Sequence, residues 1–154
     1  MQELTPKSPF YSKGLRFSCQ RCSSCCRFEP GYVFLSEKDK IILETSLNLG
    51  NKEFSQSYCR WVTLSNGMDH LSLKEKSNYD CIFWTEDGCS VYESRPLQCR
   101  AYPFWPWILS NRKNWEMTAQ SCPGIGKGEL HPEDSIQNWL NQWHIEPKIH
   151  RGNI

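Results

Sequence analysis

The chain has 154 residues, with 18 Lys and Arg against 17 Asp and Glu, and nine cysteines. The balanced charge gives no reason to expect a nucleic-acid partner, and an odd number of cysteines cannot close a disulfide framework by itself. The first residues lack an apolar stretch long enough for a signal peptide and nothing later approaches a membrane span, so we expect a cytoplasmic protein without a membrane partner, whose thiols stay reduced.

The chain begins with irregular segments. Residues 1–18 read as an arm, because prolines and a glycine interrupt any periodicity. The cysteine run FSCQRCSSCCRF is expected in a loop, and the segment 31–36 predicts a short strand. Ser36 with Asp39 forms a variant of the capping box. The clearest helix therefore starts at Ser36 and is expected to stop at Gly50.

The spacing of hydrophobic residues changes in the middle of the chain. A short helix over 52–58 leads into an expected hairpin, in which Asn66-Gly67 is the signal for a type I′ turn. The segment CIFWTEDGCSVY predicts two short apolar pieces around a turn. A helical turn is expected over 95–100, with a proline tolerated in its first turn.

The last third predicts a second hairpin over 104–118, although Pro106 confines its first strand to an edge or a bulge. The glycine-rich stretch after Cys122 is expected to be a loop and not a phosphate site, because no strand–turn–helix context surrounds it. A helix is expected over 132–144, where apolar residues recur at helical spacing. We therefore expect an α+β fold, in which a single domain, 1–154, places short helices and hairpins around a cysteine-ligated metal centre.

Four of the nine cysteines crowd into eight residues: Cys19, Cys22, Cys25 and Cys26. Two-residue gaps return successive thiols to one side of a loop, so three sulfurs can converge on one centre. Zinc usually takes two separated pairs of ligands, whereas three evenly spaced thiols match the C-x2-C-x2-C part of bacterial cubane runs. The fourth ligand of such a cluster comes from a Cys-Pro dipeptide, which Cys122-Pro123 supplies. The spacing favours a [4Fe–4S] cluster on Cys19, Cys22, Cys25 and Cys122, with zinc as the alternative.

Five motifs in order resemble one known family: CQRCSSCC, VFLSEKD, DCIFW, GCSVYESRPLQCRAYPFW and CPGIGKG. Over residues 17–128 the chain is similar to the CxxCxxCC cysteine-cluster family, also called YkgJ-like. Members are described as zinc- or iron-chelating proteins, some carry the label of iron–sulfur oxidoreductase, and a related cluster occurs in flagellin lysine N-methylases. The resemblance implies eight metal ligands: Cys19, Cys22, Cys25, Cys26, Cys81, Cys89, Cys99 and Cys122. Cys59 falls outside the pattern and is expected to be a small buried or semi-exposed thiol.

Two arginines near Cys99 are candidate cofactor-binding residues. Arg95 and Arg100 could offset the negative charge of a thiolate-bound centre. The structural alternative is that Arg95 caps carbonyl groups and pairs with Glu93. The four histidines are scattered and are expected to be solvated or capping residues, although His70 could replace a missing thiol.

The sequence thus predicts a metal-binding protein with one centre or two, carrying a [4Fe–4S] cluster or zinc. One alternative is an Fe–S redox enzyme or a component of a protein lysine N-methylation system. Another is a zinc or iron carrier that passes its ion to a protein client. In each case the metal could supply folding energy to a domain with long loops.

Overall fold

The computed structural model describes residues 8–23, 25–27 and 31–152, and it mixes helices with small sheets, as expected for the α+β class. Two compact units can be distinguished in the chain. Unit 1 comprises Met1–Cys22 and Pro103–Asn141, and unit 2 comprises Ser23–Tyr102 and Gln142–Ile154. The single domain over 1–154 stays a prediction. Among the described residues, no helix combines the length and the apolar character needed to cross a bilayer.

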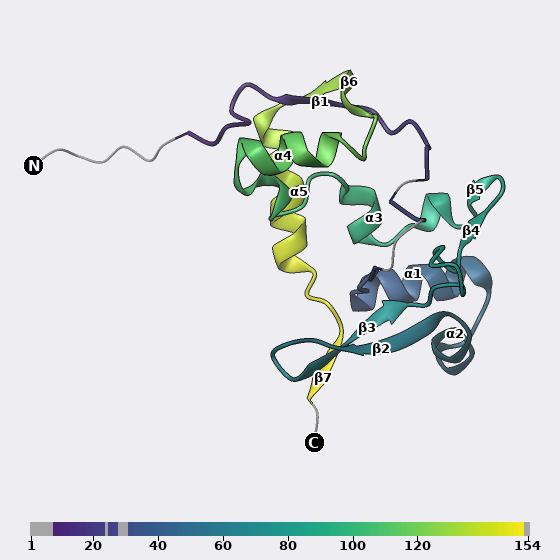
Figure 1. The fold of residues 1–154 in the computed structure, drawn as a ribbon. Coiled ribbons are helices and arrows are strands. Elements are labelled where there is room, and N and C mark those ends of the chain that lie inside the picture. The colour runs from purple at the N-terminus through teal and green to yellow at the C-terminus, as the bar shows by residue number, and fades with distance from the viewer. Residues whose placement is uncertain (1–7, 24, 28–30, 153–154) are drawn as a thin grey trace, which may run out of the picture. The chain divides into compact units, whose positions relative to one another are not determined.

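Unit 2 contains most of the short elements: α1 (Glu37–Leu47), α2 (Asn51–Tyr58), β2 (Cys59–Thr63), β3 (Met68–Leu73), β4 (Trp84–Thr85), β5 (Gly88–Cys89), η1 (Tyr92–Ser94), α3 (Leu97–Ala101) and β7 (His150–Gly152). Its main sheet is antiparallel in the order β2-β3-β7, so a strand from the end of the described chain pairs with the central hairpin (Figure 1). The core of this unit gathers Leu35, Leu43, Phe54, Leu71 and Phe83, all buried.

The predicted capping box opens α1. The hydroxyl of Ser36 accepts from the backbone N–H of Asp39 at 3.1 Å, and the carboxylate of Asp39 accepts from the N–H of Ser36 at 2.9 Å. The helix ends earlier than expected, because Asn48 takes the left-handed conformation (φ 55°) that stops it. Gly50 instead precedes α2 as its N-cap.

The predicted hairpin is confirmed as β2 and β3, with Cys59 opposite Leu73. Its turn is not type I′, because Gly67 has a positive φ of 76° and Asn66 does not. The segment 31–36 is not a regular strand, since within unit 2 it makes isolated bridges only, one of them between Phe34 and Ser72. The expected pair of short pieces around residues 86–88 is present as β4 and β5.

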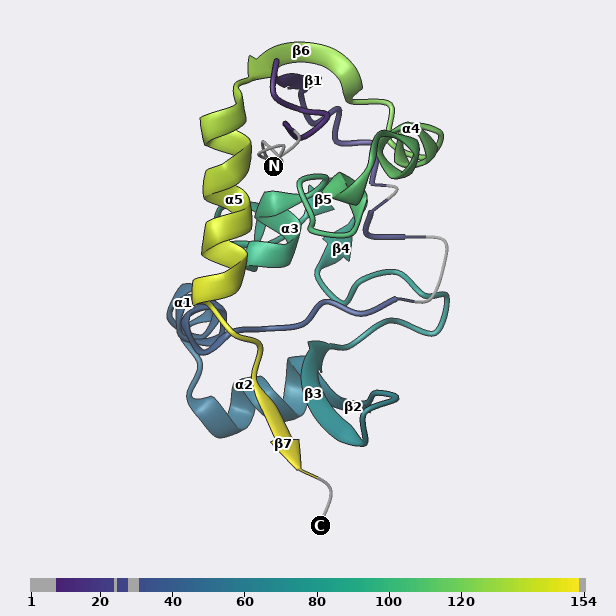
Figure 2. The ribbon, with the colours of Figure 1, turned by 90° about the vertical axis from the view of Figure 1, so that its left-hand side faces the viewer.

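Unit 1 holds β1 (Leu15–Phe17), η2 (Ile108–Ser110), α4 (Arg112–Ala119), β6 (Ile125–His131) and most of α5 (Glu133–Ile145). The long helix α5, drawn in yellow-green in Figure 2, confirms the helix predicted over 132–144. The irregular arm predicted over 1–18 is wrong at β1, which pairs with β6 in antiparallel fashion.

The loop predicted after Cys122 is also wrong, because its second half is strand β6. Glycines allow this strand to approach the backbone beside β1. A Cβ on Gly124 would collide with the carbonyl oxygen of Ser18, and a Cβ on Gly128 would collide with the Ser18 hydroxyl. The glycines therefore serve close packing between two strands.

The hairpin predicted over 104–118 is wrong as well. The segment forms η2 and α4 instead, and the side chain of Asn111 caps α4 by accepting from the N–H of Asn114 at 2.8 Å. An asparagine N-cap outweighs the strand preference of the surrounding aromatic residues. Phe104 stacks on Trp115 of α4 at a centroid distance of 5.8 Å, which places this aromatic residue in the core of the unit.

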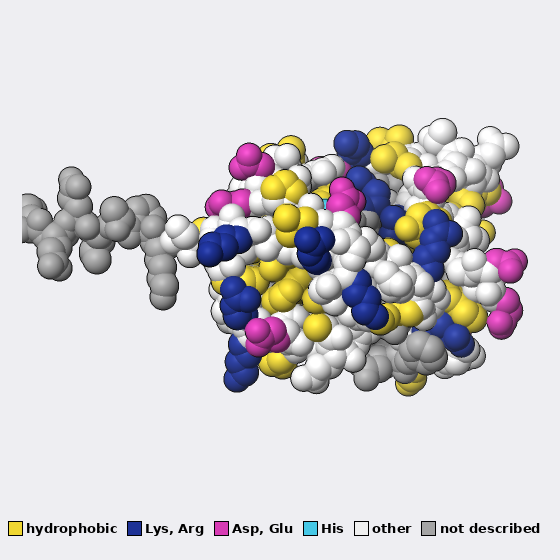
Figure 3. Space-filling view, turned by 90° about the horizontal axis from the view of Figure 1, so that it is seen from above, with side chains coloured by type: hydrophobic (Ala, Val, Ile, Leu, Met, Phe, Trp, Pro, Cys, Tyr) yellow, Lys and Arg dark blue, Asp and Glu magenta, His cyan; other side chains and the backbone are white. Residues whose placement is uncertain are grey.

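The surface carries charges of both signs. On the face drawn in Figure 3, Lys and Arg side chains are interspersed with Asp, Glu and hydrophobic side chains. This mixture agrees with the near-neutral composition of the chain.

Candidate metal centre

Five cysteines of unit 2 come together from four separate segments: Cys25, Cys26, Cys81, Cys89 and Cys99. The Sγ atoms of Cys25 and Cys26 lie 3.7 Å apart. The negative charge of a Cys25 thiolate raises the pKa of each of the other four thiols, which therefore lie within its electrostatic reach. The chain thus brings five of the eight predicted ligands into one group.

A polar clamp ties the cysteine run to the segment around Cys81. The backbone N–H of Cys81 donates to the carbonyl of Cys26 at 2.7 Å. Next to this bond, Arg27 Nε pairs with Asp80 Oδ1 at 3.0 Å, and the guanidinium lies 3.7 Å from the ring centroid of Trp84. We call Arg27, Asp80 and Trp84 the Arg27–Asp80 clamp. It fixes the residues directly after Cys26 and directly before Cys81.

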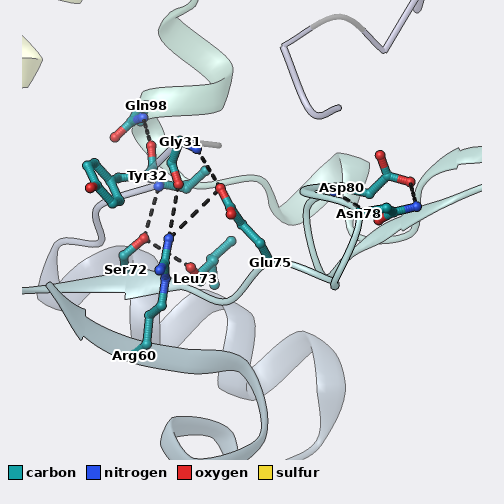
Figure 4. Close-up of polar contacts among 10 residues, drawn as sticks. Gly31, Tyr32, Arg60, Ser72, Leu73, Glu75, Asn78, Asp80 and Gln98 are labelled. Carbon is teal, nitrogen blue, oxygen red and sulfur yellow. Dashed lines mark hydrogen bonds and ion pairs between the residues drawn. The ribbon is translucent and has the colours of Figure 1, made fainter. Parts of the chain in front are cut away.

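Two further bonds support this clamp. The indole N–H of Trp84 donates to the hydroxyl of Ser23 at 2.9 Å, so the clamp reaches both sides of the Cys25-Cys26 pair. The second carboxylate oxygen of Asp80 accepts from the side-chain amide of Asn78 at 3.1 Å (Figure 4). Asp80 is almost fully buried, and these donors satisfy its charge.

The segment after the cysteine run is anchored by Arg60. This side chain points from β2 toward the segment, donates to the carbonyl of Gly31 at 3.2 Å and lies 3.9 Å from Glu75 Oε1 (Figure 4). The same carboxylate oxygen accepts from the N–H of Gly31 at 2.5 Å. Gly31 is therefore held by both Arg60 and Glu75.

Helix α3, which carries Cys99, is bound to the same segment. The side chain of Gln98 accepts from the N–H of Phe34 at 3.0 Å and donates to the carbonyl of Tyr32 at 2.6 Å. At the start of α3, the N–H of Leu97 donates to Asp39 Oδ1 at 2.9 Å. Short polar links thus position Cys99 in a chain region with little regular structure.

The thiols differ in acidity. A hydrogen bond from Cys26 lowers the pKa of Cys25 to about 7, and the same bond raises the pKa of Cys26. Burial raises the pKa of Cys81, Cys89 and Cys99. Cys25 is therefore prepared to act as a thiolate, whereas the others need a nearby cation to lose their protons.

Such a donor set fits a thiophilic cation, since zinc and iron both take thiolate sulfur as ligand. Among the described residues, no three His, Cys, Asp or Glu side chains form a group that could already hold an ion. An ion bound by this group therefore has to draw the sulfurs inward from their present positions.

The remaining predicted ligands belong to unit 1. Cys19 and Cys22 are exposed, and Cys122 is buried directly after α4. The N–H of Arg21 donates to the sulfur of Cys19 at 3.4 Å, across a turn in which Arg21 has a positive φ of 52°. The cluster predicted on Cys19, Cys22, Cys25 and Cys122 takes three ligands from unit 1 and one from unit 2, and it stays a prediction.

The two candidate arginines have different surroundings. Arg95 donates from Nε to the carbonyl of Tyr92 at 2.8 Å and lies 3.8 Å from the centroid of that ring. Its positive charge also lowers the pKa of Cys25, Cys89 and Cys99. This effect is smaller than that of the Cys26 hydrogen bond on Cys25 and that of burial on Cys89 and Cys99. Arg100 donates to the carbonyl of Arg95 at 3.0 Å. Arg95 therefore both caps a carbonyl and faces the thiols.

Sequence reasoning missed the Arg27–Asp80 clamp, although both charged residues are direct neighbours of predicted ligands. Arg27 directly follows one predicted ligand, and Asp80 directly precedes another. It also missed Lys148, whose charge interacts with Cys99 and for which the sequence gives no sign. Cys59 is buried in β2, as expected for a thiol outside the ligand set.

Comparison with known proteins identifies the family of the chain. Uncharacterized protein MJ0939 of Methanocaldococcus jannaschii is 24% identical over 123 residues, which are 77% of this chain and 40% of that relative. The chain thus spans about two fifths of the relative's length. No solved structure matches. Residues 18–123, which include all nine cysteines, match the family described as "Putative zinc- or iron-chelating domain", and the chain belongs to this CxxCxxCC family.

Proposed function

We propose that this protein chelates one zinc or iron ion through four thiolates of unit 2: Cys25, Cys81, Cys89 and Cys99. The observation that carries the proposal is that the backbone N–H of Cys81 donates to the carbonyl of Cys26, next to Cys25, at 2.7 Å. The charge of a Cys25 thiolate also raises the pKa of Cys81, Cys89 and Cys99, which arrive from three other segments. Burial disfavours the negative charge of the thiolates, and a bound divalent cation compensates that charge. Metal binding and deprotonation of the thiols therefore occur together. A cytoplasmic setting belongs to the proposal, because thiols stay reduced there.

Cys26 has a separate role in this proposal. Five thiols exceed the four ligands of a tetrahedral site. Since its hydrogen bond to Cys25 raises the pKa of Cys26, that thiol stays protonated and donates to the sulfur of its neighbour. Arg95 lies near the same sulfurs and offsets part of the net negative charge of a tetrathiolate site.

Cys19, Cys22 and Cys122 remain proposed ligands, on the strength of the family pattern and the C-x2-C-x2-C spacing. With Cys25 they form the set predicted for a [4Fe–4S] cluster. The two assignments differ in composition. A thiolate site on unit 2 holds one ion and no inorganic sulfide, whereas a cubane cluster holds iron and sulfide in equal numbers.

Metal and acid-labile sulfide analysis of protein purified without oxygen tests the proposal. Stoichiometric zinc or iron without sulfide is expected for the unit 2 site. Cys81→Ser and Cys99→Ser should lose the ion, whereas the matched control Cys59→Ser should keep it. A folded wild-type protein without metal, or ligand variants that retain the full amount, would refute the proposal.

The carrier alternative is favoured by one observation, the exposure of the Cys25 thiol. Reactive, accessible thiolates exchange metal more readily than sealed ones. A carrier should surrender its ion to a chromogenic chelator within minutes, while a structural site should hold it. The redox alternative requires a visible absorption shoulder that bleaches with dithionite, and colourless zinc protein would exclude it.

A further inference from the structure

Two histidines that are far apart in the sequence stand opposite each other in the main sheet of unit 2. His70 in β3 is the register partner of His150 in β7. The neighbouring pair is hydrogen-bonded, since the N–H of Leu71 donates to the carbonyl of Ile149 at 3.1 Å. His70 and His150 therefore occupy a non-hydrogen-bonded position, where opposite side chains approach most closely.

The two rings lie at a spacing that one metal ion can bridge. Their centroids are 5.9 Å apart and their planes are tilted by 36°. An ion about 2.0–2.1 Å from a ring nitrogen lies roughly 3.2 Å from that ring's centroid. Two such rings on one ion are thus separated by at most about 6.4 Å, so the observed spacing is compatible with a shared ion.

One ring nitrogen of each histidine is a candidate ligand. Nδ1 of His150 lies 3.2 Å from the carbonyl oxygen of Lys148, a contact that places the proton on Nδ1 and the lone pair on Nε2. Metal-binding histidines commonly have such a carbonyl behind the ring. Among the residues that the structure describes, Nε2 of His70 is buried and has no hydrogen-bond partner. Buried polar nitrogens are normally satisfied, and a bound ion is one way to satisfy this one.

The next charged pair of the sheet lies away from the two histidines. Adjacent residues of a strand point to opposite faces of the sheet, so the next register pair, Asp69 and Arg151, lies on the other face. There Arg151 is held by its ion pair to Asp69 at 3.2 Å. His150 is exposed, so its ring can swing aside and let an ion reach His70.

We infer that His70 and His150 form a second metal site, selective for divalent cations that favour imidazole: Zn²⁺, Ni²⁺ and Cu²⁺. Water completes the coordination sphere, because the chain supplies two ligands. Imidazole sites bind Cu²⁺ more tightly than either Ni²⁺ or Zn²⁺. The site differs from the thiol group in donor type and does not rest on the proposed function.

Titration of tag-free protein, loaded with one equivalent of zinc for its thiols and then freed of excess zinc, tests the inference. Ni²⁺ is added, and the histidine ring signals are followed by NMR. We expect the signals of His70 and His150 to broaden first, at one Ni²⁺ per chain. His150→Gln should weaken this binding about tenfold or more, and His70→Gln should do the same. The exposed His144→Gln on α5 is the matched control and should bind as the wild type does.

Unchanged Ni²⁺ affinity in His150→Gln would overturn the inference, and so would first broadening at His144. His150 is exposed, so its replacement should leave the fold intact even if His70→Gln destabilises the sheet. Both histidine variants should retain the zinc held by thiols. Loss of nickel binding is therefore distinguishable from failure of the thiol site.

Discussion

Asp39 is only 1% exposed, and each of its carboxylate oxygens accepts a hydrogen bond from a backbone N–H. One oxygen accepts from Ser36 at the start of α1, and the other from Leu97 at the start of α3. A buried carboxylate is tolerated because hydrogen bonds replace its water. This residue therefore fixes the start of the helix that carries Cys99.

Replacing Asp39 with Ala should lower the free energy of unfolding by about 2–4 kcal/mol, because two buried N–H groups lose their acceptor. Urea unfolding followed by circular dichroism measures this loss. Glu37→Ala, an exposed first-turn residue of the same helix, is the control and should change stability far less. A loss below about 0.5 kcal/mol for Asp39→Ala would contradict the assignment.

Lys148 should make the free energy of unfolding depend on pH. Its Nζ is buried and finds no hydrogen-bond partner in the described part of the chain, and burial lowers its pKa below the ordinary value of 10.5. In the interval between the lowered pKa and 10.5 the unfolded chain binds more protons than the folded chain. This group therefore makes stability rise as pH rises through that interval.

Lys148→Met should remove this contribution. We expect the difference in unfolding free energy between the variant and the wild type to favour the variant at neutral pH and to shrink as pH rises toward 10.5. Comparing the two proteins at each pH cancels the titration of the cysteines. A difference that does not vary with pH would count against a lysine disfavoured by burial.

At the scale of elements, local signals in the sequence predict helices better than strands. Ser36 with Asp39 identifies α1 because a capping box acts within four residues. The missed helix α4 had a local signal in its N-cap Asn111, whereas the error at β6 arises because its partner is distant. Strand β6 exists because it pairs with β1, more than a hundred residues earlier, and the glycines that allow the approach look like a loop in isolation.

Gly124→Ala tests this close approach within unit 1. Its new Cβ would collide with the Ser18 carbonyl, so β1 should separate from β6 and amide hydrogens of Leu15–Phe17 should exchange faster. Hydrogen exchange read by mass spectrometry reports the change. Gly50→Ala is the control, because nothing lies within 4 Å of the position of its Cβ. Unchanged protection of β1 in Gly124→Ala would show that the strands tolerate the methyl group.

The Arg27–Asp80 clamp makes another element-scale prediction, for a double-mutant cycle. Arg27→Gln and Asp80→Asn should each lower the free energy of unfolding by about 1–3 kcal/mol, because the clamp joins a half-exposed cation to a buried carboxylate. The double variant should lose less than the sum of both. Lys38→Gln, an exposed residue of α1, is the control. Strictly additive losses would show that the two side chains do not act together.

For the whole molecule, the candidate site shows where sequence reasoning ends. The pattern identifies which cysteines are ligand candidates, because their spacing is local information. It does not say that Cys25 shares a neighbourhood with Cys81, Cys89 and Cys99, because that depends on how α3, β5 and the Arg27–Asp80 clamp come together. The predicted grouping of Cys25 with Cys19, Cys22 and Cys122 followed the C-x2-C-x2-C spacing and the Cys122-Pro123 dipeptide.

Removing the metal should destabilise unit 2, since few regular elements surround its thiols and ion binding contributes folding free energy. We expect chelator-treated protein to melt at a lower temperature than the holo protein and to recover after zinc or iron is returned anaerobically. Circular dichroism and calorimetry follow the transition. An apo protein with the same melting temperature would mean that the ion contributes nothing to the fold.

The pairing of β7 with β3 has a consequence for biosynthesis. Unit 2 takes its outer strand from His150–Gly152, about eighty residues after β3. A nascent chain on the ribosome can close the hairpin of β2 and β3 early, but β3 keeps an unpaired edge until the late segment emerges. During translation this edge is open to pairing with other polypeptides, so the late strand protects the sheet from association.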